Sequence, residues 1–352
     1  MRRRLWLCGI LVLALAAMGP LAACGDDDEK GAAQVELPDA AESGLDADVD
    51  LPDADEAPDE PDADEAPDAE TPPPTPKAWQ AMTTGTDRNL VKLWGTSPSD
   101  LWAVGFSGTI LHDDGTGWAA VSAPTSSALM AVFGSSASDV WAAGNLSTLV
   151  HFDGAAWASV DHPQTNALSG LWGTASDDVW AIGAAGNILR YDGTSWSALP
   201  SGTTEWLRDI WGASASDVWI VGAKGTLLRW DGAALASVVS GTDRTLYDVW
   251  GSSADSVWAV GQDGIILHFD GTDWSAQTSG TTVSLHAVWG RAADDVYAVG
   301  GSTEGDAIIL HFDGAAWSVQ ESPVTSALWD VFGVGGEVWI AGYDGTILRQ
   351  EP

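Results

Sequence analysis

A pattern that recurs seven times at a nearly constant spacing constrains this chain more than any other feature. Each copy contains a Trp-Gly or Phe-Gly pair, and successive pairs lie 39 residues apart five times and 43 residues apart once. A period of about 40 residues is typical of propellers and solenoids. The aromatic residues of the seven pairs are Trp94, Phe133, Trp172, Trp211, Trp250, Trp289 and Phe332.

Each copy contains four short runs rich in Val, Ile and Trp, separated by Gly, Asp, Ser and Thr. In the fifth copy the runs are LYDVW, SVWAVG, IILHF and DWSAQ. Such runs predict strands, and four antiparallel strands in about 40 residues make one blade of a propeller. A solenoid would need polar capping repeats, and no copy is atypical in that way. The sequence therefore predicts an all-β fold, a seven-bladed β-propeller over residues 78–352.

The two ends of the repeat region predict how the ring closes. The seventh copy stops at residues 346–352 and lacks a fourth strand, whereas Trp79 to Met82 (WQAM) precedes the first copy and resembles the fourth strand at Trp274 to Gln277 (WSAQ). We therefore expect the strand at Trp79 to complete the last blade.

The first residues have the features of an export signal. Three arginines follow Met1, an apolar run extends from Leu5 to Met18, and Leu21-Ala22-Ala23-Cys24 resembles the lipobox of bacterial lipoproteins. The resemblance implies that residues 1–23 are a lipoprotein signal peptide and that Cys24 is lipidated, which would attach the protein to a membrane. An uncleaved membrane anchor is the alternative. Since Cys8 would leave with the signal, no disulfide is expected.

Residues 24–77 are predicted to be a disordered acidic linker rich in Pro, Asp and Ala. From residue 25 on they hold 20 acidic side chains against Lys30 and Lys77, too little apolar surface to offset the entropy of ordering. Specific calcium binding is not favoured, because the acidic runs lack fixed ligand spacing. Gly25 follows the cysteine, and Asp26 to Glu29 resemble the acidic tether of some surface lipoproteins. These features imply an outer-membrane lipoprotein, exposed to the periplasm or the cell surface.

The net charge of −36 argues against one class of partner. Nucleic-acid binding requires a basic surface, so none is expected. The sequence contains no Ser-His-Asp or metal-ligand signature, and we expect no metal, no cofactor and a monomer.

Two repeated features are interpreted as structural. Most tryptophans recur at fixed positions in the blades, where they would pack between blades; Trp206, Trp230 and Trp329 do not. Third strands end in a basic residue followed two positions later by an acid, as in His112 and Asp114. Because residues i and i+2 share one side of a strand, we expect an ion pair or hydrogen bond between them in each blade.

The turn Asp-Gly-x-x-Trp, present at Asp192 to Trp196 and Asp270 to Trp274, resembles the Asp-box of BNR repeats in sialidase-like and photosystem assembly-factor-like propellers. The whole unit also resembles repeats in secreted bacterial lipoproteins. The resemblance covers nearly all of residues 79–352 and implies a fold rather than an activity.

Function is expected where the copies differ. After a constant Leu in the first strand, the seven blades carry Val91, Met130, Ser169, Arg208, Tyr247, His286 and Trp329. The loops that lead into this strand and the turns between the second and third strands also vary, and we expect both to lie on one face of the ring. The candidate ligand-binding residues are Glu205, Trp206, Arg208, Arg244, Tyr247 and His286, with Trp329 and Tyr343 across the channel.

A further set of charged residues follows the variable position. Asp209, Asp248 and Asp330 would lie near the channel mouth. Either a bound cation or pairing of Asp330 with Lys92 of the neighbouring blade would balance their charge.

Exposed aromatic rings beside Arg and carboxylates are typical of surfaces that bind sugars or proteins. We expect a non-catalytic cell-envelope lipoprotein that binds a carbohydrate or a protein. The alternatives are a periplasmic assembly factor for envelope proteins and, less favoured, a glycan hydrolase or lyase, since the spacing of a catalytic set is missing.

Overall fold

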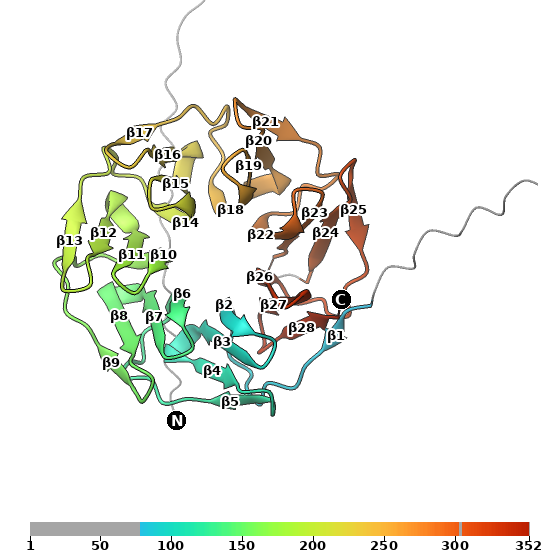
Figure 1. Ribbon diagram of the computed structural model, residues 1–352. Helices are drawn as coiled ribbons and strands as arrows, with labels where there is room; N and C mark the ends of the chain where they lie inside the picture. Colours follow the sequence, from blue (N-terminus) through green and yellow to red (C-terminus); the bar gives the residue numbers. More distant parts are fainter. Residues whose placement is uncertain (1–77, 303–304, 352) are drawn as a thin grey trace, which may run out of the picture. The chain divides into compact units, whose positions relative to one another are not determined.

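The computed structural model describes residues 78–302 and 305–351, which form seven four-stranded antiparallel sheets arranged in a ring (Figure 1). The predicted seven-bladed β-propeller is confirmed. The signal peptide, Cys24 and the acidic linker lie outside the described residues and stay predictions.

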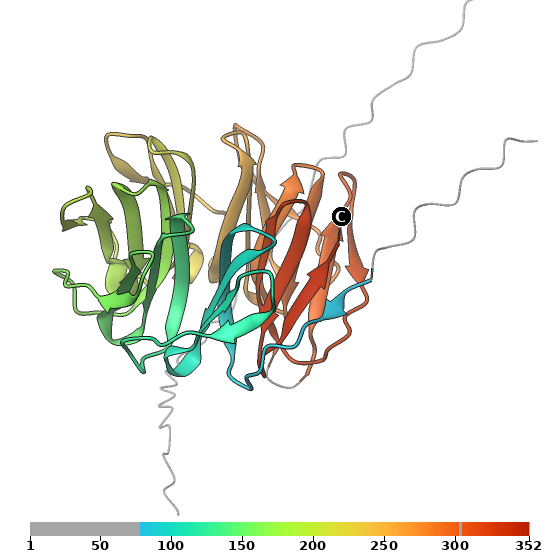
Figure 2. The same cartoon turned by 60° about the horizontal axis from the view of Figure 1, so that its bottom comes forward.

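The first six blades use consecutive strands, with the first strand innermost and the fourth outermost (Figures 1 and 2). The first strands are β2 (Leu90–Ser97), β6 (Leu129–Ser136), β10 (Leu168–Ala175), β14 (Leu207–Ser214), β18 (Leu246–Ser253), β22 (Leu285–Ala292) and β26 (Leu328–Val334). The second strands are β3 (Asp100–Gly105), β7 (Asp139–Gly144), β11 (Asp178–Gly183), β15 (Asp217–Gly222), β19 (Ser256–Gly261), β23 (Asp295–Gly300) and β27 (Glu337–Gly342).

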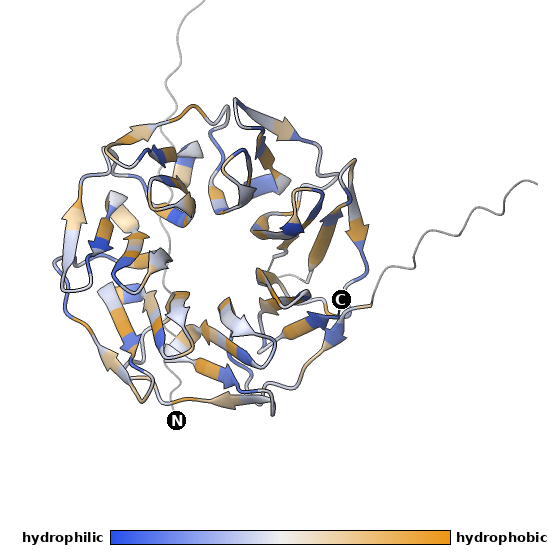
Figure 3. Cartoon of the chain, in the orientation of Figure 1, coloured by the Kyte–Doolittle hydropathy of each residue, from blue (hydrophilic) through white to orange (hydrophobic). Residues whose placement is uncertain are grey.

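The strands in the outer half of each blade are shorter and carry both apolar and polar residues (Figure 3). The third strands are β4 (Ile110–Asp113), β8 (Thr148–Phe152), β12 (Ile188–Tyr191), β16 (Leu227–Trp230), β20 (Ile266–Phe269), β24 (Ile308–Phe312) and β28 (Ile347–Gln350). The fourth strands are β5 (Trp118–Ala120), β9 (Trp157–Ser159), β13 (Trp196–Leu199), β17 (Leu235–Ser237), β21 (Trp274–Gln277), β25 (Trp317–Gln320) and β1 (Gln80–Ala81).

The ring closes as the sequence predicts. β1 pairs with β28, so that Gln80 lies opposite Arg349 and Ala81 opposite Leu348. Trp79, just before β1, is buried and meets the ring of Tyr297 in the preceding blade edge to face, with centroids 5.8 Å apart. The last blade therefore contains both ends of the described chain (Figure 2).

The Trp-Gly pairs join successive blades. The ring of Trp94 lies against Gly134 of the next blade so closely that a Cβ on Gly134 would be 2.3 Å from the indole. The same contact joins Trp172 to Gly212, where the distance would be 2.5 Å. Glycine is required because any side chain would occupy the space that the aromatic ring of the preceding blade fills.

A second set of aromatic contacts joins the outer parts of the blades. Trp102 in β3 contacts Trp157, the first residue of β9 in the next blade, with ring centroids 5.4 Å apart. At the boundary between the third and fourth blades, Leu235 stands where the other blades have the tryptophan that begins the fourth strand. There Trp230 contacts Trp180, with ring centroids 5.6 Å apart. Trp230, which the repeat pattern leaves unexplained, therefore packs between blades.

The predicted pairing of third-strand bases with the turn acid two residues later is wrong. The His112 ring stacks on Trp102 in the neighbouring strand, and its Nε2 lies 2.8 Å from Oδ1 of Asp100. Because Asp100 and Trp102 are two apart on β3 and Trp102 is opposite His112, the base reaches across the sheet rather than along its own strand. Only Arg349, among the described residues, also approaches its predicted partner, Glu351, at 3.7 Å.

The acids of the Asp-Gly turns bind the backbone instead. Oδ1 of Asp192 accepts hydrogen bonds from the N–H groups of Thr194 and Ser195 at 2.9 and 2.8 Å. These backbone hydrogen bonds lower the pKa of Asp192. The repeated turn acid is therefore a local turn-forming residue.

The two faces of the ring differ as predicted. The turn between the second and third strands is hydrogen-bonded to the loop that leads into the first strand, as in Phe106 N–H to the Asn89 carbonyl at 2.9 Å. Both segments therefore lie on one face, here called the variable face. Five of these turns are single 3-10 turns: η1 (Phe106–Gly108), η2 (Asn145–Ser147), η3 (Ala184–Gly186), η4 (Ala223–Gly225) and η5 (Gln262–Gly264). No helix in residues 78–302 and 305–351 is long and apolar enough to cross a membrane.

Candidate functional site

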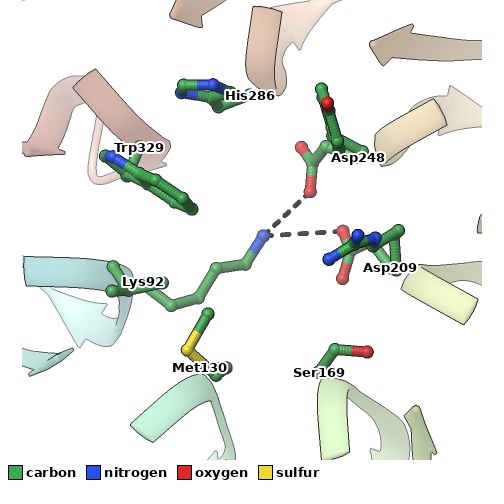
Figure 4. Close-up of a pocket in the computed structure, with 10 residues that line it drawn as sticks. Lys92, Met130, Ser169, Asp209, Asp248, His286 and Trp329 are labelled. Atoms are coloured by element: carbon green, nitrogen blue, oxygen red, sulfur yellow. Dashed lines mark hydrogen bonds and ion pairs between the residues drawn. The ribbon is translucent and has the colours of Figure 1, made fainter. Parts of the chain in front are cut away.

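The variable residues of the first strands converge on one cavity at the channel mouth, with a volume of about 300 Å³. Every first strand contributes to its lining (Figure 4). The lining residues are Val91, Lys92, Met130, Ser169, Arg208, Asp209, Tyr247, Asp248, His286 and Trp329.

A bulge explains why neighbouring residues line the same cavity. Successive side chains of a regular strand point to opposite faces, yet Arg208 and Asp209 both face the channel. The pairing of β14 with β15 shifts register between Leu207 and Asp209, which adds one residue to the inner strand and re-aims its side chains. The same shift occurs in the first strand of every blade.

Lys92 crosses the channel at the base of this cavity. Its Nζ lies 2.9 Å from Oδ1 of Asp248 and 3.5 Å from Oδ2 of Asp209 (Figure 4). It also lies 3.2 Å from Oδ1 of Asp330. Of the two interpretations left open by the sequence, the pairing of Asp330 with Lys92 is the one observed. Among the described residues, no group of three or more His, Cys, Asp or Glu side chains is placed to hold a metal ion.

Backbone N–H groups complete the network. Oδ2 of Asp330 accepts a hydrogen bond from Leu93 N–H, and Oδ2 of Asp248 accepts one from Val288 N–H, both at 2.7 Å. Each carboxylate therefore bridges Lys92 and the backbone of a neighbouring blade. We call Lys92, Asp209, Asp248 and Asp330 the channel network.

Burial is the main cause of the pKa shifts of two carboxylates in the channel network. It raises the pKa of Asp330 to about 7, against the lowering effect of Lys92. It also raises the pKa of Asp209 well above its usual range. Burial alone would lower the pKa of Lys92, but the three carboxylates together raise it well above the ordinary value. The lysine therefore stays charged at neutral pH, while Asp209 and Asp330 retain protons more readily than exposed carboxylates do.

A second cavity of about 200 Å³ lies beyond the channel network, lined by the aromatic residues of the Trp-Gly pairs. Lys92, Asp209 and Asp248 line both cavities. The network therefore separates a mixed cavity at the variable face from an apolar one deeper in the channel.

Aromatic rings form a continuous arc along one side of the mouth. Tyr247 meets His286 edge to face with centroids 5.7 Å apart, His286 stacks on Trp329 at 4.7 Å, and Trp329 stacks on Tyr343 at 5.5 Å. Trp329 is thus beside His286, not across the channel from it as predicted. Burial lowers the pKa of His286, and its Nδ1–H donates to the Leu328 carbonyl at 2.9 Å. The ring is therefore neutral at pH 7.

Arg208 extends this arc into the fourth blade. Its guanidinium carbon lies 4.1 Å from the ring centroid of Trp206 and 5.9 Å from that of Tyr247. Burial lowers the pKa of Arg208. Its Nε is buried and has no hydrogen-bond partner among the described residues.

The structure thus divides the eight predicted residues into three groups. Arg208, Tyr247, His286 and Trp329 line the cavity. Trp206 contacts the guanidinium of Arg208, and Tyr343 contacts the ring of Trp329, both from outside the cavity. The remaining two, Glu205 and Arg244, form ion pairs with Lys224 and Asp263 in the neighbouring turns. Met130 and Ser169, which also line the cavity, were not among the predicted binding residues, although both occupy the variable position.

Comparisons with known proteins give the fold. No family model matches the chain, and no curated protein matches it. Among solved structures, a YCF48 bound to D1 peptide is 19% identical, with a TM-score of 0.65 over 78% of this chain and 95% of the other. YCF48 from Cyanidioschyzon merolae is 15% identical, with a TM-score of 0.64 over 78% and 99%. Virginiamycin B lyase from Staphylococcus aureus is 14% identical, with a TM-score of 0.69 over 78% and 99%. At these identities the likeness shows a shared propeller fold and no more.

Proposed function

We propose that this protein is a non-catalytic binding protein of the bacterial cell envelope, attached by a lipid on Cys24, whose variable face holds a ligand at the channel mouth. One observation carries the proposal. The positions that differ among otherwise repeated blades gather on a single cavity, whereas the repeated positions are used in packing and turns. In a repeat fold, residues that packing does not require are available for recognition.

A protein or peptide ligand is favoured over a carbohydrate by the cavity lining. A sugar presents many hydroxyl groups, but the polar groups around this cavity are largely engaged. Ser169 Oγ donates to the Leu207 carbonyl at 2.6 Å, Asp209 and Asp248 are paired with Lys92, and His286 Nδ1 is bound to a carbonyl. A YCF48 of the same fold holds a peptide, which supports the capacity of such a ring to do so.

A non-catalytic role is supported by the state of the carboxylates. Acid-base catalysis needs a carboxyl group or imidazole free to exchange a proton with the substrate. Asp209 and Asp248 face Lys92 at the base of the cavity.

Photocrosslinking on intact cells tests the proposal. A photoreactive phenylalanine analogue would replace Trp206, which is 37% exposed at the rim of the mouth, and, as a matched control, the exposed Thr194 in an Asp-Gly turn of the other face. We expect one discrete protein adduct from position 206 and none from position 194. Adducts of equal yield from both positions, or none from position 206, would refute a binding role for the variable face.

Two further measurements test the remaining parts. A glycan array probed with the full chain, beside Trp206→Ala, is expected to show no saturable binding; binding that the substitution abolishes would replace the protein ligand with a sugar. In cells fed radioactive palmitate, the wild-type chain is expected to carry the label and Cys24→Ser to lack it, and absence of the label from the wild-type chain would contradict lipid attachment.

A further inference from the structure

Arg208 differs from the other arginines of the described residues in having no acidic partner. The remaining six lie within ion-pair distance of a carboxylate: Arg88, Arg190, Arg229, Arg244, Arg291 and Arg349. Arg208 has none within that distance among the described residues, although it is half-buried at the cavity. An uncompensated guanidinium held away from water costs free energy, so a counter-charge from a ligand would be favoured here.

The surroundings of Arg208 leave its edge available. Trp206 covers one part of the planar group at 4.1 Å and Tyr247 lies 5.9 Å away, contacts that fix the guanidinium without using its N–H donors. The nearest acid in sequence, Asp209, is directed to Lys92. A guanidinium with free N–H groups binds carboxylates through two parallel hydrogen bonds.

The rest of the cavity determines what the carboxylate is attached to. Val91, Met130 and Trp329 give apolar walls, and Ser169 Oγ and His286 Nδ1 are bound to backbone carbonyls. A cavity of about 300 Å³ holds a small apolar group. The lining therefore fits one anionic group joined to a compact apolar body.

We propose that Arg208 binds the carboxylate of a ligand whose apolar body lies against Val91, Met130 and Trp329. This inference rests on the proposed function, because both use the same cavity. A small free carboxylic acid and the C-terminal residue of a peptide share this chemistry.

The channel network does not oppose such a ligand. Burial raises the pKa of Asp330 to about 7 and that of Asp209 well above its usual range, so part of the acid in the network is protonated at neutral pH. The positive charge of Lys92, within 3.5 Å of Asp209 and 2.9 Å of Asp248, offsets part of the remaining negative charge. Repulsion of an incoming carboxylate is correspondingly small.

Titration calorimetry on the full chain tests the inference with paired probes. The first pair is 4-phenylbutyrate and its primary amide; the second is the tripeptide Ala-Val-Leu with a free C-terminus and the same tripeptide amide. We expect an acid to bind at least about tenfold more tightly than its amide, since hydrogen bonds to charged groups are the stronger ones. Tighter binding of 4-phenylbutyrate would indicate a small carboxylic acid as the ligand, and tighter binding of the tripeptide acid would indicate a peptide C-terminus.

Two variants make the assignment specific. Arg208→Met keeps an unbranched side chain over Trp206 and is expected to abolish the difference between acid and amide. Arg244→Gln, a change in an arginine of the same face that is already paired with Asp263, is expected to retain it. Removal of an unpaired buried charge should also leave the unfolding temperature of Arg208→Met unchanged or raised, a readout independent of binding.

The inference is overturned if acid and amide bind equally, if neither acid binds, or if Arg208→Met retains the preference. Failure here is distinguishable from failure of the proposed function. If crosslinking from position 206 persists unchanged in Arg208→Met, the variable face remains the binding surface. Only the assignment of a ligand carboxylate to Arg208 is then refuted.

Discussion

The Nζ atom of Lys92 lies 2.9 Å from Oδ1 of Asp248, although 156 residues separate the two in the chain. Lys92 belongs to β2 in the first blade and Asp248 to β18 in the fifth. Asp209 of the fourth blade and Asp330 of the seventh complete the contacts of the ammonium group. The channel network therefore joins parts of the ring that share no sheet.

Replacing Lys92 with methionine is expected to lower the free energy of unfolding by about 3 kcal/mol at pH 7.5, because it leaves three buried carboxylates without a cation. The loss should be smaller at pH 5, where Asp209 and Asp330, whose pKa values burial raises, take up protons. Urea unfolding followed by tryptophan fluorescence measures it. Lys224→Met, which removes an exposed ion pair with Glu205, is the control and should cost less than about 1 kcal/mol. Equal effects of the two changes would show that the network does not stabilise the ring.

Asp330 is expected to make stability depend on pH. Burial raises its pKa to about 7, above the value near 3.9 of an unfolded chain. The folded state then binds more protons between these limits, so the contribution of Asp330 falls as pH rises from about 4 to 7. The stability of the protein minus that of Asp330→Asn should therefore decrease over this range.

The comparison with Asp330→Asn is needed because His268 and His286, whose pKa values burial lowers, contribute with the opposite sign near pH 6. Urea midpoints of both proteins at four values of pH between 4.5 and 7.5 give the difference. A difference that is constant or rises with pH would contradict a raised pKa.

Trp79 is expected to stabilise the junction of the ring as strongly as its counterparts stabilise other blade boundaries. Trp79 and Trp157 are each 7% exposed, and each meets an aromatic ring of the preceding blade. Replacing either with alanine should cost about 3–5 kcal/mol. Thermal and urea unfolding of the two variants provide the comparison. A cost below about 1 kcal/mol for Trp79→Ala alone would mean that the ring is stable without its closing strand.

Two adjacent residues in η3 are expected to respond in opposite ways. Ala185 and Gly186 both have positive φ, 58° and 70°. A Cβ on Gly186 would lie 2.0 Å from the Thr203 carbonyl oxygen, whereas Ala185 is exposed. Gly186→Ala should destabilise by about 3 kcal/mol, from backbone strain and overlap together. Ala185→Gly should leave stability unchanged or raise it by up to about 1 kcal/mol. Differential scanning calorimetry distinguishes these outcomes, and equal melting temperatures would refute the steric argument.

The fold could be predicted because packing repeats. The spacing of Trp94 and its counterparts gives the length of the repeat. The missing fourth strand in the last copy predicts that the strand at Trp79 closes the ring. Such a repeat can be recognised in a single sequence, without an alignment of related proteins, because the copies can be compared with one another.

The site could be predicted only in part, because its geometry depends on features without a repeat signal. The bulge that turns both Arg208 and Asp209 to the channel contradicts the alternation that a strand normally shows. The partner of His112 also depends on which residue is opposite it in the neighbouring strand, and not on its own sequence neighbours. Glu205 and Arg244 form ion pairs with charged residues in neighbouring turns. These partners could not be predicted, because they are not close in the sequence.

The channel network also depends on which copies the ring contains and on their order. Nearly identical blades have nearly identical interfaces, so a ring with one copy omitted, or one borrowed from another chain, would bury almost the same apolar surface. A ring without the first, fourth, fifth or seventh copy would lose a member of the network, and Asp330 neighbours Lys92 only when the first copy follows the seventh. One lysine and three aspartates thereby distinguish copies that the hydrophobic contacts treat as equivalent, because only one cyclic order brings the ammonium group beside all three carboxylates.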